Sequence, residues 1–177
     1  MVLQKKIISN KFFLIFNAAI ALSILALMNF KLIPAISAAA QGMQIFDLRF
    51  MGYDLEYVHN FLMALSPTGR EIYLKQQLPL DFVFPIFYSL VFMGLALRLP
   101  KKTSVTALTL TALLFLCDYL ENLLSLIILR KEGLDRLLIS FASASTIAKT
   151  VLLLVLITLI LTAYIFMRVK KLFKSKA

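Results

Sequence analysis

The sequence predicts an all-α membrane protein whose four transmembrane helices form an antiparallel bundle, and three observations lead to this prediction. Of its 177 residues, 61% are hydrophobic and only 16% are charged, whereas a soluble domain is about half apolar and about a quarter charged. Four segments are apolar over the roughly 20 residues that a helix needs to cross the hydrocarbon core. The net charge of +10 comes mainly from short Lys and Arg clusters at the ends of these segments.

The expected spans are residues 12–33, 80–97, 103–129 and 145–167 of one domain covering residues 1–177. The last apolar run begins at Leu137, so we expect its first two turns to project beyond the lipid or to tilt. The first span also imitates a secretory signal peptide, with Lys5 and Lys6 before it and three alanines after it. Because its apolar run is longer than the 7 to about 15 residues usual in signal peptides, we expect it to be retained.

The long loop between the first two spans, residues 34–79, is rich in Phe, Tyr, Leu and Met. An amphipathic helix is predicted from Asp54 to Leu65, because Leu55, Val58 and Leu62 recur on one face with Leu65. Such a loop either folds as an outer cap over the bundle or lies in the membrane interface. We expect the cap.

A second short helix is predicted after this one, over residues 69–77. Thr68 and Glu71 fit a capping box, with Thr68 at the N-cap and Glu71 three residues later. This helix is expected to run into Pro79 and the second span. The outer loop thus contributes short amphipathic helices between spans 1 and 2.

Orientation follows from the distribution of basic residues, which are enriched in cytoplasmic loops. Eleven of the 19 lie in the N-terminal tail, the loop between spans 2 and 3, and the C-terminal tail. Both termini are therefore expected in the cytoplasm, and termini outside the cell are the alternative. Basic clusters beside spans suit anionic headgroups, so membrane lipids are the expected partners and nucleic acid is not.

The third span contains a polar stripe formed by Asp118, Glu121, Asn122 and Ser125. These positions are spaced i, i+3, i+4 and i+7, which places them on one helix face. No other charge lies between Thr103 and Leu129. A carboxylate at this depth costs at least about 2.5 kcal/mol, so it normally faces a partner or a wet cavity. We therefore expect the stripe to face the interior of the bundle.

The second and fourth spans offer partners for this stripe. Asp81, Pro85 and Tyr88 share a face of the second span, and Pro85 leaves the carbonyl of Asp81 without a helical donor. Lys149 is the only charge between residues 136 and 168. Counting turns from the basic boundaries places Asp81, Glu121 and Lys149 together in the outer half of the bundle, with Asp118 one turn deeper.

A polar pocket is predicted where these residues converge. Arg70 and Tyr73 of the cap are expected to reach it, and Phe84 and Phe87 to form an apolar wall. Each polar residue also has a plainer interpretation. Asp81 suits a helix N-terminus, Lys149 can snorkel to the headgroups, and a Glu or Asn can bind a neighbouring helix without any ligand.

Motifs for metal or cofactor chemistry are missing from the sequence. His59 is the only histidine and Cys117 the only cysteine, which argues against a His-based metal site or a Ser-His-Asp triad. No Gly-rich phosphate loop is present. We therefore expect neither a metal nor a cofactor.

A pattern found in uncharacterised bacterial four-span membrane proteins resembles the polar positions of this chain between Gly69 and Lys149. The matching groups are Gly69-Arg70 with Tyr73, Leu80-Asp81 with Phe84-Pro85 and Tyr88, Asp118 with Glu121-Asn122, and Ala142-Ser143 with Thr146 and Lys149. The resemblance implies a multi-pass protein of the bacterial inner membrane whose polar positions form one site. It implies no activity.

The leading functional hypothesis is a protein that binds or transports a small or amphiphilic ligand in this pocket. One alternative is an intramembrane enzyme for a lipid-like substrate, with Glu121 or Asp118 as general acid or base. The other is a structural subunit whose polar stripe contacts another membrane protein. Four spans are few for a transporter, so transport would favour a homodimer.

Overall fold

The computed structural model describes residues 7–131 and 135–174, and every regular element in these ranges is helical. Four helices are long and apolar enough to cross a membrane: Lys11–Ala39, Pro67–Ala96, Lys101–Arg130 and Arg136–Phe173. This confirms the prediction of an all-α protein with four helices that are long and apolar enough to span a membrane. Lys5, Lys6 and Lys176, which contributed to the predicted orientation, lie outside the described residues.

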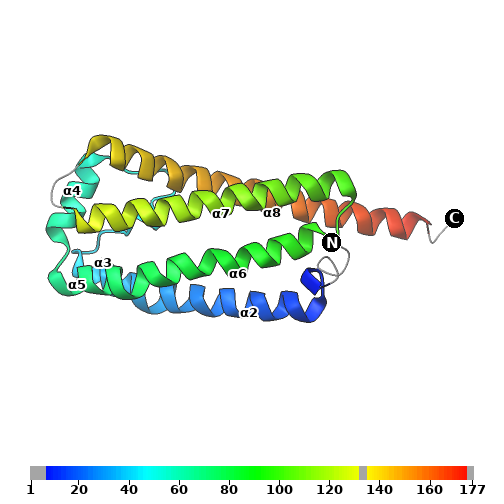
Figure 1. Ribbon diagram of the computed structural model, residues 1–177, viewed down its shortest axis with the longest axis horizontal. Helices are drawn as coiled ribbons and strands as arrows, with labels where there is room; N and C mark the ends of the chain where they lie inside the picture. The colour runs from blue at the N-terminus through cyan, green and yellow to red at the C-terminus, as the bar shows by residue number, and fades with distance from the viewer. Residues whose placement is uncertain (1–6, 132–134, 175–177) are drawn as a thin grey trace.

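The long helices lie side by side along the long axis of the molecule, and each runs opposite to the one before it (Figure 1). They contain α2 (Lys11–Leu27), α6 (Leu78–Ala96), α7 (Lys101–Arg130) and α8 (Arg136–Lys174). The short helices α3 (Ile33–Ala39), α4 (Leu55–Ala64) and α5 (Pro67–Ile72) gather at one end. At the other end α2 begins and α8 projects beyond its neighbours.

Two of the long helices continue through the prolines that begin and end the predicted loop of residues 34–79. The first extends past Pro34 to Ala39, and the second begins twelve residues before Pro79, at Pro67. A π-helical turn precedes each proline: η1 (Met28–Leu32) ends two residues before Pro34, and η3 (Tyr73–Gln77) two residues before Pro79. Proline lacks an N–H and its ring collides with the carbonyl four residues back. A wider turn gives that ring room, so the helix continues.

The N-cap predicted at Thr68 is wrong, because the helix begins two residues earlier. Ser66 is the N-cap, and its hydroxyl accepts a hydrogen bond of 3.1 Å from the backbone N–H of Gly69. Pro67 then occupies the first helical position, where a missing N–H costs nothing. Glu71 forms an ion pair with Lys75 at 2.7 Å. The sequence signal was ambiguous because Ser66 and Thr68 are both good capping residues.

The segment between the first two long helices folds as a cap over one end of the bundle (Figure 1). Helix α4 begins after the N-cap Asp54 and buries Val58 and Phe61, and it packs against α8. The short 3-10 helix η2 (Phe46–Leu48) also contacts α8. Aromatic rings pack together inside the cap. The ring centroid of Phe46 lies 5.1 Å from that of Tyr53, 5.0 Å from that of Phe61 and 6.2 Å from that of Tyr73.

The loop that follows η2 is fixed to α8 at one point. The backbone N–H of Tyr53 donates a hydrogen bond of 2.8 Å to the hydroxyl of Ser143. Gly52 has a φ of +89°, and a Cβ atom there would lie 2.7 Å from that hydroxyl oxygen. Only glycine suits this position, because it combines a left-handed backbone with close approach of a neighbouring helix.

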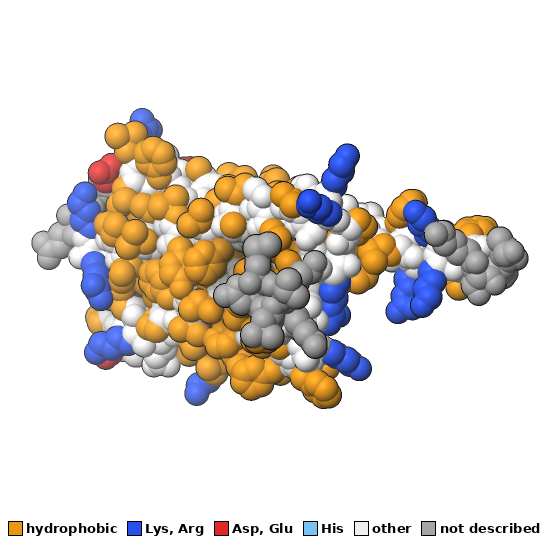
Figure 2. All heavy atoms as spheres, turned by 45° about the vertical axis from the view of Figure 1, so that its right-hand side comes forward, with side chains coloured by type: hydrophobic (Ala, Val, Ile, Leu, Met, Phe, Trp, Pro, Cys, Tyr) orange, Lys and Arg blue, Asp and Glu red, His pale blue; other side chains and the backbone are white. Residues whose placement is uncertain are grey.

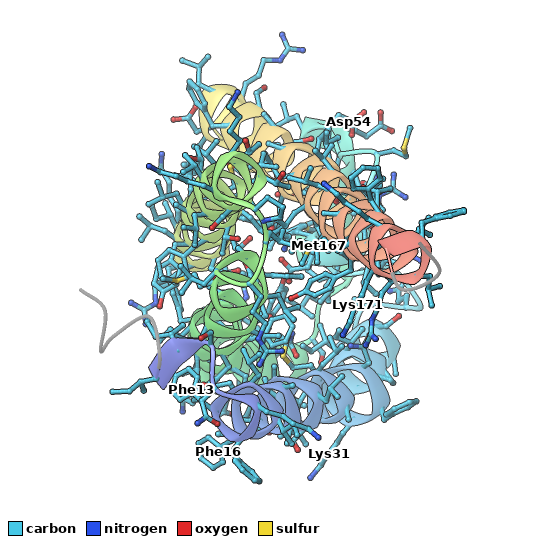
Figure 3. All side chains as sticks on the ribbon, turned by 90° about the vertical axis from the view of Figure 1, so that its right-hand side faces the viewer. Phe13, Phe16, Lys31, Asp54, Met167 and Lys171 are labelled. Carbon is cyan, nitrogen blue, oxygen red and sulfur yellow. The ribbon has the colours of Figure 1, made fainter. Side chains whose placement is uncertain are left out.

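Apolar side chains cover the middle of the face shown in Figure 2, and Lys and Arg side chains gather toward its two ends. Seen along the long axis, Phe16 on α2 and Lys31 on η1 point away from the bundle (Figure 3). An apolar outer surface with basic ends is the distribution expected of helices that meet lipid tails in the middle and headgroups at both ends.

Candidate functional site

Lys149 points into the bundle and contacts three carboxylates. Its Nζ atom forms an ion pair with Glu121, lies 3.3 Å from Asp118 and lies 3.9 Å from Asp47. Glu121 and Asp118 belong to α7, whereas Asp47 belongs to η2 in the cap. The interpretation of Lys149 as a snorkelling residue therefore does not apply. One lysine connects α7, α8 and the cap.

Neutral hydroxyl groups complete the coordination of the two α7 carboxylates. The Thr146 hydroxyl donates a hydrogen bond of 2.7 Å to Glu121 Oε1, and the Tyr88 hydroxyl donates one of 2.8 Å to Asp118 Oδ2. Glu121 is completely buried and Asp118 is 6% exposed. Charge-assisted hydrogen bonds of this kind are about twice as strong as neutral ones. They hold the carboxylates in place while Lys149 lies between them.

Asp81 lies on α6 on the other side of the cluster and uses its side chain and its backbone differently. Its carboxylate accepts a hydrogen bond of 2.9 Å from the amide of Gln77. Its backbone carbonyl, which Pro85 leaves without a helical donor, accepts a bond of 2.7 Å from the amide of Asn122. Asn122 thus satisfies a carbonyl that the sequence predicted to be free.

A cavity of about 420 Å³ lies beside this cluster. The long helices and η2 all contribute to its wall, so it lies between them, and the exposed side chains of Leu25, Phe50 and Leu154 on its wall open it to the surface. Its polar wall includes Asp47, Asp81, Asp118, Lys149 and the Tyr88 hydroxyl. The rest is apolar, with Met28 and Leu25 from the first helix and further side chains from the others: Phe84, Phe92, Leu114, Leu153 and Leu154.

The structure brings most of the predicted pocket residues to this place, in two layers. Asp81, Tyr88, Asp118 and Lys149 line the cavity, and Glu121 and Asn122 lie behind them against Lys149 and Asp81. All four members of the polar stripe on α7, Ser125 included, are buried.

Three of the residues expected at the pocket do not line the cavity. The guanidinium of Arg70 donates a hydrogen bond of 2.8 Å to the carbonyl of Leu129 near the end of α7, so it does not reach the cavity. Tyr73 is buried in the aromatic core of the cap, where its nearest rings are Phe46 and Phe61. Phe84 lines the cavity as expected, but Phe87 does not. The pattern of residues on a helix face predicts which side chains point into the bundle. It does not predict which of them line the same cavity.

Sequence reasoning missed Asp47 and Gln77. Asp47 is the first acidic residue of the chain, and it lies between Phe46 and Leu48. An acid enclosed by large apolar residues in a loop that caps a bundle is a usable signal of an inward-facing charge. Gln77 carried no such signal, because it ends a polar stretch that looked like the exposed part of a short helix.

The edge of the cluster is closed by Tyr53, which precedes α4 and lies near Glu121, Asp47 and Lys149. Burial raises the pKa of Tyr53 well above its ordinary value. Its hydroxyl group therefore stays neutral at any physiological pH and adds no charge to the site.

Within residues 7–131 and 135–174, no group of three or more His, Cys, Asp or Glu side chains has the arrangement needed to hold a metal ion. The four carboxylates are instead separated by Lys149, Gln77 and the cavity. Chemically, the lining of the site combines hydrogen-bond acceptors and acidic groups with apolar contact surface.

The fold and the site together define a multi-pass membrane protein with a cluster of charged residues inside its helical bundle. Comparison with protein-family models, with curated proteins and with solved structures finds no match for the chain.

Proposed function

We propose that this protein binds or transports a small amphiphilic ligand in the cavity beside Lys149. The observation that carries the proposal is the cavity itself: about 420 Å³, with carboxylates and a tyrosine hydroxyl as well as leucine, methionine and phenylalanine side chains in its lining. Ligand sites are typically concave and mostly apolar, with a few polar groups that fix orientation.

The membrane setting of this proposal follows the expected topology. The protein is an antiparallel four-helix bundle of the bacterial inner membrane with both termini in the cytoplasm, and α3, α4 and α5 form the outer cap. The charged cluster then lies in the half of the bundle nearer the cap. A ligand with an apolar part reaches it from the lipid, beside the exposed side chains of Leu25 and Leu154 on the cavity wall. A homodimer remains the proposed assembly if the activity is transport.

The structural-subunit hypothesis is less well supported, because the polar stripe on α7 already has partners within the chain. Glu121 and Asp118 pair with Lys149, and Asn122 binds the Asp81 carbonyl. The intramembrane enzyme keeps one specific observation in its favour. Tyr88, Asp118 and Lys149 form a hydrogen-bonded chain of proton donors and acceptors on the cavity wall, which suits acid–base chemistry on a bound lipid-like molecule.

A cavity-filling substitution with a matched control tests the proposal. Thr150 lines the cavity, and its neighbour Val151 is 53% exposed on the outer face of α8. Thr150→Phe places a ring in the cavity, whereas Val151→Phe places the same ring in lipid. Native mass spectrometry of protein purified from its own membranes measures the bound small molecule.

The wild-type protein and Val151→Phe should carry a bound species that Thr150→Phe lacks, with equal thermal unfolding midpoints as proof of folding. A wild-type protein without any bound species, or a species that persists in Thr150→Phe, contradicts the proposal. Conversion of an added lipid-like substrate, lost in Asp118→Asn, would select the enzyme instead.

A further inference from the structure

We propose that the ligand is an organic cation, a protonated amine or quaternary ammonium group with an apolar body; this inference rests on the proposed function of the same cavity. The reason begins with charge. Asp47, Asp81, Asp118 and Glu121 supply four carboxylates to one region, whereas Lys149 supplies the only positive side chain among the residues that line the cavity. An uncompensated buried charge is strongly unfavourable, so the cluster favours a further positive charge.

Lys149 is already occupied by the carboxylates of the chain. Its ammonium group contacts Glu121, Asp118 and Asp47, and an ammonium group has three donors. An anionic ligand would have to displace one of these partners and would then face the remaining carboxylates at close range. The described part of the cavity wall offers it no second cation.

Asp81 supplies a carboxyl group that has no cationic partner among the described residues. It is 7% exposed, it lines the cavity, and among the described residues no Lys or Arg forms an ion pair with it. Its carboxylate accepts a hydrogen bond of 2.9 Å from the side-chain amide of Gln77. The carbonyl oxygen of the same amide also favours a hydrogen-bond donor from the ligand. Gln77 is completely buried and lines the cavity, and its Oε1 atom has no hydrogen-bond partner. A buried acceptor without a donor marks a place for a donor from outside the chain.

The apolar wall supplies a second, independent reason for a cation. Phe84, Tyr88 and Phe92 are spaced four residues apart on α6 and all line the cavity. Their rings form a column, with centroids 5.1 Å apart for Phe84 and Tyr88 and 6.0 Å apart for Tyr88 and Phe92. Aromatic faces attract ammonium groups, and aromatic cages are the usual means of binding quaternary ammonium ligands.

The size and lining of the space favour an organic ion over a bare metal ion. A cavity of about 420 Å³ with leucine and methionine on its wall would leave most of its volume unfilled around a metal ion. An ammonium group beside Asp81 and Gln77, with its apolar body against Leu114, Leu153 and Met28, uses both kinds of wall.

Three probes of similar shape and different charge test the assignment. They are benzyltrimethylammonium, its uncharged carbon isostere neopentylbenzene, and the anion phenylmethanesulfonate. Calorimetric titration into the full-length protein in lipid nanodiscs, with empty nanodiscs subtracted, measures each affinity. The cation should bind at least about ten-fold more tightly than either of the others.

Two variants and one control place this preference in the cavity. Asp81→Asn keeps the shape of the side chain. It should lower the affinity for the cation by about ten-fold and leave the affinity for the neutral isostere unchanged. Glu71→Gln removes an acid that is exposed and paired with Lys75, and it should change nothing. If Asp81→Asn fails to fold, Phe92→Leu should lower the ratio of cation to isostere affinity.

The outcomes separate this inference from the function on which it rests. Equal affinity for cation and isostere, or tighter binding of the anion, overturns the cationic ligand even if Thr150→Phe abolishes binding of all three probes, in which case the cavity function stands. The cationic ligand is also overturned, and the cavity function again stands, if the protein carries a native ligand that Thr150→Phe removes but does not bind the cation. Binding that Thr150→Phe does not affect removes both proposals.

Discussion

Asn122 on α7 donates a hydrogen bond of 2.7 Å to the backbone carbonyl of Asp81 on α6, which is the carbonyl that Pro85 deprives of its helical donor. A defect in one helix is thus corrected by a side chain from its neighbour. The bond also fixes the position of Asp81 relative to α7, and therefore relative to Asp118 and Glu121. The geometry of the cluster depends on this pairing.

Loss of the Asn122 amide should destabilise the protein in a way that depends on Pro85. Asn122→Leu leaves a buried carbonyl unsatisfied and should lower the free energy of unfolding by about 1–3 kcal/mol. In a Pro85→Ala background the carbonyl regains a helical N–H, so the same substitution should cost clearly less. Denaturant titration followed by circular dichroism measures both values, and an equal cost in the two backgrounds would show that Asn122 acts through other contacts.

Lys149 and Glu121 should be energetically coupled. Lys149→Met alone leaves three neighbouring carboxylates without a cation, and Glu121→Gln alone removes the partner in closest contact with Lys149; breaking a buried pair costs about 3–5 kcal/mol. The double variant should recover part of the sum. Recovery should be incomplete, because Asp118 and Asp47 still lack a cation. Strict additivity in thermal unfolding would mean that the two residues do not interact.

Asp118→Asn should preserve the fold and abolish ligand binding. The amide oxygen can still accept the hydrogen bond from Tyr88, but the negative charge facing the cavity is gone. Ser125→Ala is the matched control, because Ser125 is buried on the same face of α7 and does not line the cavity. Native mass spectrometry and thermal unfolding give the two readouts. A fully loaded Asp118→Asn protein would indicate that the stripe is structural.

The energetic effect of the close contact at Gly52 can be measured by comparison with Gly42, a glycine of similar backbone geometry. Gly42 and Gly52 have φ values of +84° and +89°, so alanine introduces backbone strain of about 1–3 kcal/mol at either position. Only at Gly52 would the new Cβ meet neighbours, at 2.7 Å from Ser143 Oγ and 2.9 Å from Ile147 Cδ1. Gly52→Ala should therefore cost more in unfolding free energy than Gly42→Ala. Equal costs would mean that the loop moves away from α8 without penalty.

Topology is open to a direct labelling test. In a Cys117→Ala background, Met51→Cys places a thiol on the cap, where Met51 is 93% exposed, and Lys171→Cys places one near the end of α8. With the cap outside the cell, an impermeant thiol reagent should label intact cells at position 51 and not at position 171. The reverse pattern would invert the proposed orientation.

The sequence was sufficient for the features that lipid enforces. A run of about 20 apolar residues predicts a transmembrane helix. The stripe from Asp118 to Ser125 was predicted to face the interior because exposing charged side chains to lipid costs a large free energy. Lys149 was harder, because a long flexible side chain can satisfy its charge either inside the bundle or at the headgroups. Only the packed structure, with Glu121 in contact, distinguishes the two.

The features that the sequence did not predict depend on contacts between distant segments. Arg70 was placed in the pocket on its charge, but the end of α7 offers it an unsatisfied carbonyl at Leu129 instead. Asp47 reaches Lys149 only because the chain folds back over the bundle after α3. We did not predict that the helices run unbroken through Pro34 and Pro79, because proline usually ends a helix and nothing local announces a π turn.

The two π turns have a consequence for helix register. An i→i+5 turn accommodates one residue more than an α turn, and one residue corresponds to a rotation of about 100° around the helix axis. In the second helix this extra residue lies between Arg70, which binds the end of α7, and Gln77, which binds Asp81. Deleting Leu74 would let the segment become regular α-helix and would turn Arg70 away from Leu129 while Gln77 stayed in place. The wide turn is therefore what allows one continuous helix to aim two side chains at targets that a regular helix of this sequence would not reach together.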